Sequence, residues 1–267
     1  MRDLKIVVCL KVVPKSEEVS VNAETNTLER ANARSEINGA DMNALQMALE
    51  LKDTHGGYVT LLSMGPPFAE RYLRLGMAMG ADSAYLMSDR AFGGADTLPT
   101  AYALAEGVRA LAECDLIICG EESSDGATGQ VPAGIAEWLD LPQVTGATSI
   151  QLLPKSRLLR ARRELRGGYE IVEAPLPCVV SVRLGSNEPR FIDFARWDWA
   201  LEDAPVTVWS AADLGLDEER LGLKGSATAV AGVATAATAE RRREFLSGTP
   251  EEKAEQLLER IKTWTRL

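Results

Sequence analysis

The chain has 267 residues, of which 46% are hydrophobic, and its 29 Lys and Arg against 39 Asp and Glu give a formal net charge of −10. This length is sufficient for one large α/β domain with an appendage and a substantial core. The negative charge has the wrong sign for a partner made of nucleic-acid phosphates or anionic lipid. The apolar run at residues 5–13 is too short and too interrupted for a signal peptide or a membrane span. We therefore expect no nucleic acid partner and no membrane insertion.

The cysteines and the acidic residues carry no metal-site pattern. The four cysteines form no CxxC pair and lie in or beside apolar runs: Cys9, Cys114, Cys119 and Cys178. Such cysteines are typical of buried, reduced thiols, which favours the cytoplasm over an oxidising compartment. Glu121, Glu122 and Asp125 could gather a divalent ion, but a solvated acidic loop is the simpler interpretation. We expect a cytoplasmic protein without a metal site.

Strand and helix patterns alternate through the first half of the chain. Apolar runs predict strands at residues 5–10, 58–63, 84–88 and 115–119. Helical patterns lie between them, at residues 38–54 with Asn38 or Asp41 as the cap, from 64–67 to Gly80, and at residues 97–113. A polar loop at residues 14–35 can form a small hairpin. The alternation predicts a parallel sheet with right-handed connections and helices on both faces.

The pattern changes in the second half. A further helix runs through Trp138, and the segments SIQLL, RLLRARREL, GYEIV and CVVSVRL after residue 144 predict antiparallel strands that extend the sheet or form a flap. The tail after Trp199 contains the low-complexity connector ATAVAGVATAATA and an amphipathic helix at residues 249–263. A single helix cannot bury its own apolar stripe, so this helix is expected to dock on the body of the protein or on a partner.

Four polar loops follow the four predicted strands of the first half, at residues 11–14, 64–67, 91–96 and 120–128. The carboxyl ends of parallel strands share one edge of the sheet, so these loops face a common crevice, where open α/β sheets bind ligands. Their content of Gly, Ser, Thr and Asp fits a nucleotide. The alternative is that exit loops are polar simply because they are exposed.

The loop AFGGADTLPTAYAL at residues 91–104 is a candidate phosphate cradle. Gly93 and Gly94 allow a tight turn and a close approach of the backbone to a ligand, Asp96 or Thr97 can cap the next helix, and Pro99 suits its first turn. The free N–H groups and the positive end of the helix dipole would then face an anion. An ordinary strand-to-helix turn with a good cap is the alternative.

Catalytic side chains are scarce. The only histidine, His55, precedes Gly56-Gly57 at the end of a predicted helix, which argues against a histidine-based triad. The chain contains no GxxxxGK[ST] motif and no GxGxxG after its first strand. A chain that is built to hold a nucleotide but lacks an evident nucleophile or base suggests that a cofactor supplies the chemistry.

Several of these segments together resemble the β subunits of electron-transfer flavoproteins over nearly the whole chain: KIVVCLKVVP, INGADMNALQMALELKD, MGPP, GMAMGAD, SVRLGSNEPRF and ADLGL, in this order. The resemblance implies a Rossmann-like nucleotide-binding domain at residues 1–200 and a C-terminal arm with a helix at residues 201–267 that docks on the α subunit. The α subunit carries the electron-transferring FAD, and the β subunit holds AMP or a second FAD. The family's nucleotide loop matches Asp125, Gly126, Thr128, Gly129, Gln130 and Val131.

AFGGADTLPTAYAL is similar to the branch of this family that bifurcates electrons, in which it binds the diphosphate of a β-subunit FAD that takes hydride from NADH. By that likeness, four residues would contact the diphosphate or ribityl chain: Gly94, Asp96, Thr97 and Thr100. Five others would lie near the adenosine or the dinucleotide: Cys9, Asn38, Ser63, Gly65 and Gln130. Ala127 stands where that branch often has Asp, and INGAD replaces its usual MNPYD.

A partner surface also follows from the resemblance. Residues 184–191 are similar to the loop with which these proteins dock on acyl-CoA dehydrogenases, which makes candidate docking residues of Leu184, Asn187, Glu188, Pro189 and Arg190. A simple turn with Arg190 packed on Trp197 is the alternative.

The implied function is that of a redox subunit which takes two electrons from NADH at a flavin and passes them singly to a dehydrogenase and a low-potential acceptor. Two alternatives remain at this point. One is a β subunit that holds only a structural AMP. The other, from a different class, is a nucleotide-binding regulatory module of the universal stress protein type that acts as a homodimer.

Overall fold

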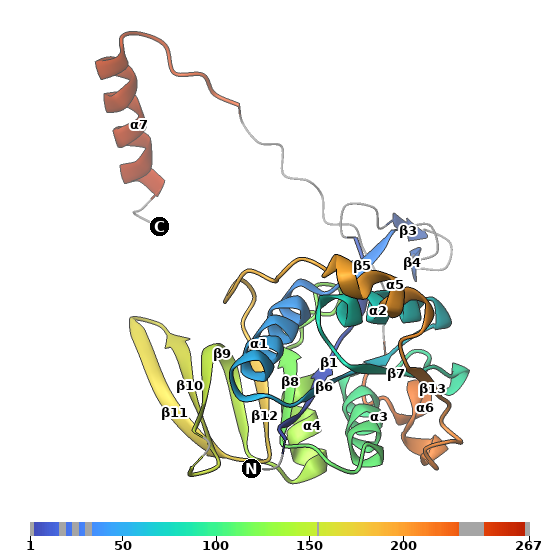
Figure 1. Ribbon diagram of the computed structural model, residues 1–267. Helices are drawn as coiled ribbons and strands as arrows, with labels where there is room; N and C mark the ends of the chain where they lie inside the picture. Colours follow the sequence, from blue (N-terminus) through green and yellow to red (C-terminus); the bar gives the residue numbers. More distant parts are fainter. Residues whose placement is uncertain are drawn as a thin grey trace. The chain divides into compact units, whose positions relative to one another are not determined.

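Figure 1 shows the computed structural model of the protein, which describes residues 3–15, 20–22, 27–29, 34–153, 155–229 and 243–264. The chain divides into two compact units, Met1–Val233 and Ala234–Leu267. Residues 230–239, most of the predicted low-complexity connector, lie outside the described residues.

The first unit is built on a nine-stranded sheet with the order β11-β10-β9-β12-β8-β1-β6-β7-β13. The strands β9, β12, β8, β1, β6, β7 and β13, which are neighbours in this order, are mutually parallel. Strands β10 and β11 continue the sheet beyond β9 in antiparallel fashion. The parallel sheet with an antiparallel extension is therefore confirmed. The strands are β1 (Lys5–Cys9), β6 (Tyr58–Met64), β7 (Ser83–Met87), β8 (Leu116–Gly120), β9 (Gln143–Leu153), β10 (Leu158–Leu165), β11 (Gly168–Pro175), β12 (Cys178–Val182) and β13 (Val206–Trp209).

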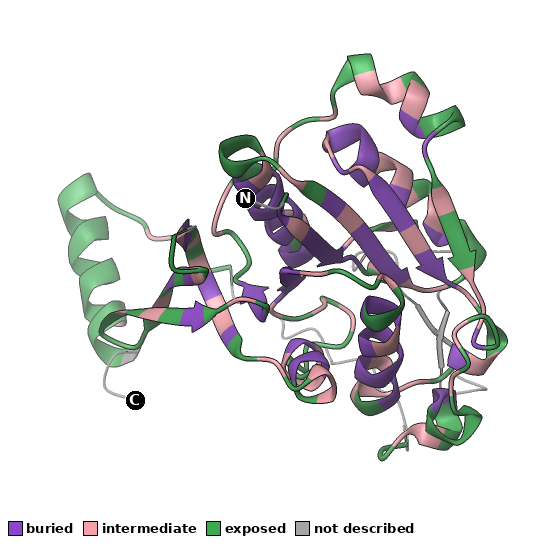
Figure 2. Ribbon diagram, turned by 60° about the horizontal axis from the view of Figure 1, so that its bottom comes forward, coloured by how far each residue is buried: buried purple, intermediate pink, exposed green. Residues whose placement is uncertain are grey.

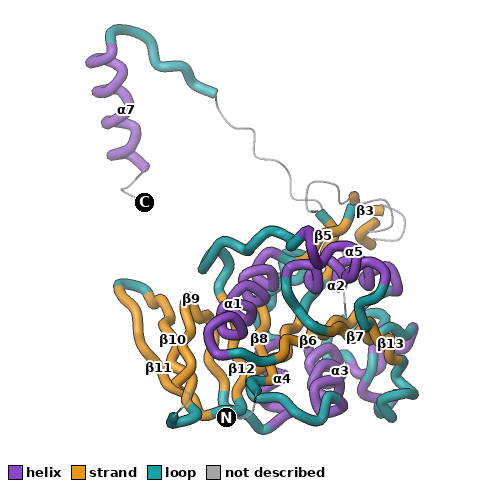
Figure 3. The backbone as a smooth tube through the Cα atoms, viewed as in Figure 1, coloured by secondary structure: helices purple, strands orange, loops and turns teal. Residues whose placement is uncertain are grey.

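Helices cover both faces of this sheet (Figure 3). One face packs against α1 (Gly39–His55), α2 (Glu70–Met79) and α5 (Phe194–Glu202), and the other against α3 (Thr97–Ala110) and α4 (Val131–Leu139). Alternate residues of β1 point to opposite faces, with Ile6 and Val8 on the α1 side and Val7 and Cys9 on the α3 side. The central strands are consequently buried on both faces (Figure 2), which explains their continuous apolar sequences.

The predicted antiparallel strand in CVVSVRL is wrong. The segment forms β12, which lies between β8 and β9 and is parallel to both. All five of its residues are buried. Burial of all five residues, including the polar Ser181, is typical of a central strand and not of an exposed flap.

Two short strand pairs follow β1 in the chain. Strand β2 (Val12–Pro14) pairs with β5 (Ser35–Ile37), and β3 (Ser20–Asn22) pairs with β4 (Thr27–Glu29), both in antiparallel fashion. The small hairpin predicted within residues 14–35 is confirmed for the residues that the structure describes there.

The tail contributes to both units. Strand β13 forms the edge of the sheet next to β7, and the short helix α6 (Gly222–Gly225) also lies in the first unit. The two compact units divide after Val233, and the expected functional boundary after residue 200 stays a prediction. The expected boundary is based on the change of composition after Trp199. The pairing of β13 with β7 nevertheless places residues 206–209 in the sheet of the first unit.

The second unit contains α7 (Pro250–Trp264), which confirms the predicted C-terminal helix. Thr249 and Glu252 cap it reciprocally: Glu252 N donates to Thr249 Oγ1 over 3.3 Å and Thr249 N donates to Glu252 Oε2 over 2.8 Å. The apolar stripe of this helix includes Leu257, Leu258 and Ile261, which are exposed within the described structure. Across the described ranges, no helix is both long enough and apolar enough to cross a membrane.

Candidate functional site

The candidate site lies at the carboxyl edge of the parallel strands, where the strand order changes direction. From β1, the chain adds β6 and β7 on one side and then β8 on the other. This is the topological switch point of the sheet, and the loops that leave β1 and β8 lie on either side of it. Ligands of open α/β sheets bind in the crevice at such a point.

A buried carboxylate joins β1 and β8 at this crevice. Asp41, in the first turn of α1, accepts hydrogen bonds from Lys11 N over 2.7 Å and from Gly120 N over 3.0 Å. Burial raises the pKa of Asp41 to about 7, although these hydrogen bonds and the Lys11 charge favour its ionised form. The sequence predicts Asp41 only as a possible helix cap, because nothing in its local pattern shows that α1 begins against the end of β8.

The loop at residues 121–130 is held over the crevice by two side chains from the other side. Lys11 Nζ donates to Asp125 Oδ1 over 2.6 Å and to Ser123 Oγ over 3.1 Å. Asn38 Nδ2 donates to Glu122 O over 2.8 Å, and Asn38 Oδ1 accepts from Ser124 N over 3.1 Å. Asn38 precedes α1 but makes no side-chain capping bond, since its amide is used by this loop.

Lys11 was not among the predicted site residues. Its position directly after the first buried strand is the signal that could have identified it. In the loop that it reaches, the side chain of Asp125 is buried and Val131 is half-buried, while four of the predicted residues are exposed and accessible to a ligand: Gly126, Thr128, Gly129 and Gln130.

The predicted cradle forms the start of α3. Asp96, rather than Thr97, is the N-cap, because its Oδ1 accepts from Leu98 N over 2.9 Å. Gly94 has φ +73°, a conformation that favours glycine. Thr97 Oγ1 donates to Gln130 Oε1 over 2.9 Å, so the cradle and the loop after β8 adjoin each other. Thr100 lies one turn further along, half-buried.

A segment of the tail closes on this cradle. Thr228 donates to Asp96 Oδ2 from its N over 2.8 Å and from its Oγ1 over 2.9 Å, and Asp96 N donates to Ser226 Oγ over 2.9 Å. Desolvation acts against ionisation of Asp96, but the hydrogen bonds from Leu98 and Thr228 outweigh it and lower its pKa. Both carboxylate oxygens of Asp96 are thus engaged within the chain.

This contact was not predicted, because residues 201–267 are expected to form an arm. The signal that could have identified it is the run GLKGSAT at residues 222–228, in which small residues and hydroxyls recur as they do in the cradle itself. Gly222 has φ +52°, and a Cβ there would lie 2.3 Å from Ala91 O. The backbone of the segment therefore packs directly on the cradle loop.

Three other predicted residues lie at the same edge, at the ends of β1 and β6. Cys9 and Ser63 are buried, with Cys9 close to Cys119 on the neighbouring strand, and Gly65 N donates to Met87 O over 3.0 Å. Ser63 Oγ has no hydrogen-bond partner in the described part of the chain. A buried hydroxyl without a protein partner at this edge fits a polar ligand there.

The predicted docking loop follows β12 and lies along α1. Asn43 Nδ2 donates to Asn187 O over 2.7 Å, Arg190 N donates to Gln46 Oε1 over 3.0 Å, and Arg190 Nη2 donates to Asp53 Oδ2 over 2.7 Å. Asn187 and Arg190 are therefore anchors of the loop. Leu184, Glu188 and Pro189 of the predicted docking residues are exposed, as are Phe191, the last residue of the predicted loop, and Phe194, the first residue of α5, which the sequence did not single out.

Two of the three acidic residues considered as metal ligands have protein partners. Glu121 Oε1 accepts from Leu184 N over 2.9 Å, and Asp125 pairs with Lys11. Among the described residues, no three His, Cys, Asp or Glu side chains gather as metal ligands would.

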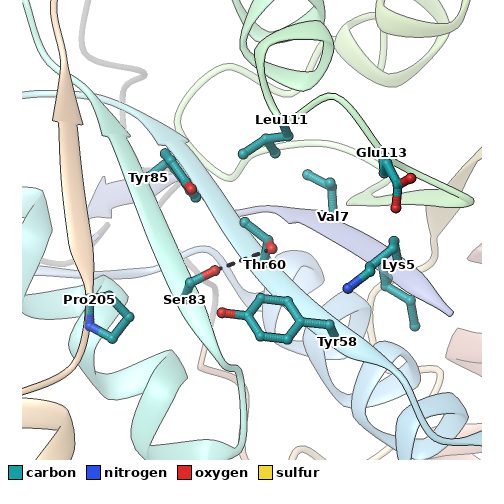
Figure 4. A pocket seen from close by; sticks show the side chains of 10 residues that line it. Lys5, Val7, Tyr58, Thr60, Ser83, Tyr85, Leu111, Glu113 and Pro205 are labelled. Carbon is teal, nitrogen blue, oxygen red and sulfur yellow. Dashed lines mark hydrogen bonds between the residues drawn. The ribbon is translucent and has the colours of Figure 1, made fainter. Parts of the chain in front are cut away.

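A pocket of about 340 Å³ lies away from this crevice (Figure 4). It is lined at the amino ends of the strands by side chains that include Lys5, Tyr58 and Tyr85, and the hydroxyls of Thr60 and Ser83 lie 3.3 Å apart in it. Since ligands of open α/β sheets bind at the opposite edge, this pocket is separate from the candidate site.

The fold is that of an α/β protein with a mainly parallel sheet, and polar loops gather at its topological switch point. Comparison with known proteins agrees: the family model described as the electron transfer flavoprotein domain matches residues 25–214. The chain belongs to the electron transfer flavoprotein β-subunit family. This membership sets aside the alternative of a universal stress protein module.

Three relatives illustrate the range of the family. The chain is 43% identical over 227 residues to the electron transfer flavoprotein subunit beta of Clostridium acetobutylicum, covering 85% of this chain and 86% of that protein. It is 41% identical over 228 residues to the caffeyl-CoA reductase-Etf complex subunit CarD of Acetobacterium woodii, with the same coverage of 85% and 86%. It is also 41% identical over 245 residues to protein FixA of Azorhizobium caulinodans, covering 89% and 87%.

Proposed function

We propose that this chain is the β subunit of a heterodimeric electron transfer flavoprotein and that its crevice binds FAD. When bound, the FAD would accept hydride from NADH and release electrons singly, one toward a dehydrogenase and one toward a low-potential acceptor. The observation that carries the choice of FAD is the cradle at the start of α3, where Gly94 has φ +73° and Thr97 and Thr100 lie in the first turn. A helix N-terminus with hydroxyls beside it suits a diphosphate.

Two adjoining sets of polar loop residues at this edge support a dinucleotide. Asn38, Lys11 and the loop at residues 121–130 form one set, and the cradle forms the next, joined by the hydrogen bond between Thr97 and Gln130. In this proposal the first set holds the adenosine and the second holds the diphosphate and ribityl chain. The residues of this chain would bind and orient the cofactor and limit its contact with water.

One observation favours the AMP-holding alternative. Asp96 already bonds Leu98 and Thr228, and Ser226 already accepts from Asp96 N, so the tail of the chain itself occupies part of the cradle. A β subunit that holds only AMP would use the part of the crevice near Asn38 and would keep the cradle as a purely structural contact. The two candidates differ in the ligand that contacts Thr97 and Thr100.

Two partner surfaces complete the proposal. The amphipathic helix α7 would dock on the α subunit and bury Leu257, Leu258 and Ile261, which are 46%, 52% and 42% exposed. The loop beside α1 would dock on a dehydrogenase of the acyl-CoA type or on another redox protein. Its exposed apolar side chains are Leu184, Phe191 and Phe194, at 63%, 94% and 82%. Docking on a partner would remove these side chains from water.

The double substitution Asp96→Ala with Thr97→Ala tests the cradle. It removes the cap of α3, the tie to Thr228 and one hydroxyl, so we expect the purified heterodimer to lose most of the FAD of the β site and to retain the FAD of the α subunit. The measurement is the amount of FAD per heterodimer after gel filtration.

The matched control is Asp193→Ala, which removes the cap of α5, a hydrogen bond of 2.8 Å from Ala195 N, away from the crevice. This control shares the stability cost of a lost cap, about 1 kcal/mol, and should leave the FAD content unchanged. An unchanged FAD content in the double variant would contradict the assignment of the cradle to the FAD site.

A further inference from the structure

We propose that Asp41 is a positioning residue for the nucleotide crevice: its carboxylate ties the loop after β1 to the end of β8, and its ionisation therefore controls the affinity for FAD. The inference rests on the proposed function, because it concerns the same crevice. Asp41 itself need not contact the ligand, since both of its oxygens are engaged by the backbone.

The two hydrogen bonds of Asp41 reach across the point at which the crevice opens. Lys11 lies two residues after the end of β1, and Gly120 is the last residue of β8. The fit is tight: a Cβ on Gly120 would lie 2.3 Å from Asp41 Oδ1 and 2.8 Å from the backbone of Ala40. The start of α1 therefore packs closely against the end of β8, and Asp41 fixes the carboxyl ends of β1 and β8 relative to one another.

The hydrogen bonds of Asp41 also determine the position of the loop at residues 121–130. Asp41 holds the main chain of Lys11, whose side chain reaches Asp125 and Ser123. Asn38, three residues before Asp41, holds the same loop through Glu122 O and Ser124 N. A displacement of Lys11 would be transmitted to the loop at residues 121–130, which borders the proposed adenosine part of the crevice.

The strength of the tie depends on the proton of Asp41. An ionised carboxylate offers acceptors at both oxygens, whereas a protonated one carries a hydrogen on one of them. Lys11 and the Asn38 side chain, which face Asp41, favour the carboxylate, but burial is the larger effect and raises the pKa of Asp41 to about 7. Cys119, at the end of β8, points to the α3 side of the sheet and stays neutral, because its hydrogen bond with Cys9 and its burial raise its pKa well above the usual value.

The test is the affinity of the β site for FAD as a function of pH, measured on the heterodimer after removal of the β-site nucleotide. FAD is the probe because its diphosphate has no titrating monoester, whereas the monoester of AMP titrates near pH 6. We expect wild-type affinity to weaken roughly tenfold between about pH 8.5 and about pH 5.5, the loss that corresponds to one charge-assisted hydrogen bond. Asp41→Asn should bind weakly throughout, without this pH dependence.

Asp115→Asn is the matched control. Asp115 is buried at the amino ends of the same two strands and accepts from Lys5 N over 3.0 Å, so its loss weakens the sheet but leaves the carboxyl edge in place. Its heterodimer should show the wild-type pH profile for FAD. An Asp41→Asn protein that binds FAD like the wild type, with the same profile, overturns the inference.

Two further outcomes separate the alternatives. A wild-type affinity for FAD that is flat or that increases toward acidic pH also overturns the inference. Protonation of Asp41 would increase the affinity if it only relieved charge repulsion with the phosphates, whereas loss of the hydrogen bonds to Lys11 and Gly120 would decrease it. This measurement on the wild type suffices if Asp41→Asn does not fold. A wild-type heterodimer that binds no FAD in the β site at any pH contradicts the proposed function instead.

Discussion

Gly222→Ala is expected to destabilise the chain by roughly 2–4 kcal/mol and to abolish retention of FAD in the proposed site. A Cβ at this position would lie 2.3 Å from Ala91 O and 2.8 Å from Gly93 O, and both are backbone atoms that no rotamer change can move. The segment at residues 222–228 would have to leave the cradle loop, which would break the ties of Asp96 to Ser226 and Thr228. Urea unfolding and the FAD content of the heterodimer measure the two effects.

The control for this substitution is Gly215→Ala in the same tail segment. Gly215 has φ +60°, similar to the +52° of Gly222, but a Cβ there would meet no atom within 4 Å. It should therefore cost only the left-handed conformation, about 1–2 kcal/mol, and should leave FAD bound. Equal effects of the two substitutions would contradict the assigned contact between the tail and the cradle.

The second large effect is a pH-dependent difference in stability between the wild type and Asp41→Asn. Burial raises the pKa of Asp41 from 3.8 to about 7, so the folded state binds this proton more tightly than the unfolded state does. The resulting stabilisation is complete below about pH 4 and is lost as the pH rises through about 7. Because one pKa unit corresponds to about 1.4 kcal/mol, the stability of the wild type relative to Asp41→Asn should fall by roughly 4 kcal/mol over this range.

Urea unfolding of both proteins at a series of pH values measures this difference, in which the titration of all other groups cancels. A difference that stays constant between about pH 4 and about pH 8 would contradict the perturbed titration of Asp41. The loss of stability at high pH is compatible with the expected gain in FAD affinity. Ionisation of Asp41 costs folding free energy, but it provides the second acceptor through which Asp41 joins Lys11 to Gly120.

The parallel sheet could be predicted because its evidence is local and periodic. Runs such as KIVVC and LIIC, separated by helical patterns, define buried strands and crossovers without knowledge of their neighbours. The strand in CVVSVRL was assigned wrongly because period and composition do not say where a strand inserts in the sheet. Its five buried residues show that it became a central strand between β8 and β9.

The site could be predicted only in part, for the same physical reason. The shared edge of the four exit loops follows from parallel pairing, and Asn38, Thr97 and Gln130 do lie on it. The contacts that give these loops their shape join residues distant in the chain: Asp96 with Thr228, Lys11 with Asp125, Asp41 with Gly120. Such pairs leave no periodic pattern, so the roles of Lys11, Asp41 and residues 222–228 emerge only from the folded chain.

The most direct test of the account is the nucleotide content of the purified heterodimer. Denaturing the complex and separating the released nucleotides by chromatography would count FAD and AMP per heterodimer. A crevice that extends from Asn38 to the cradle at Gly94 and Thr97 predicts two FAD and no AMP. One FAD together with one AMP would contradict the assignment of the cradle to a second flavin.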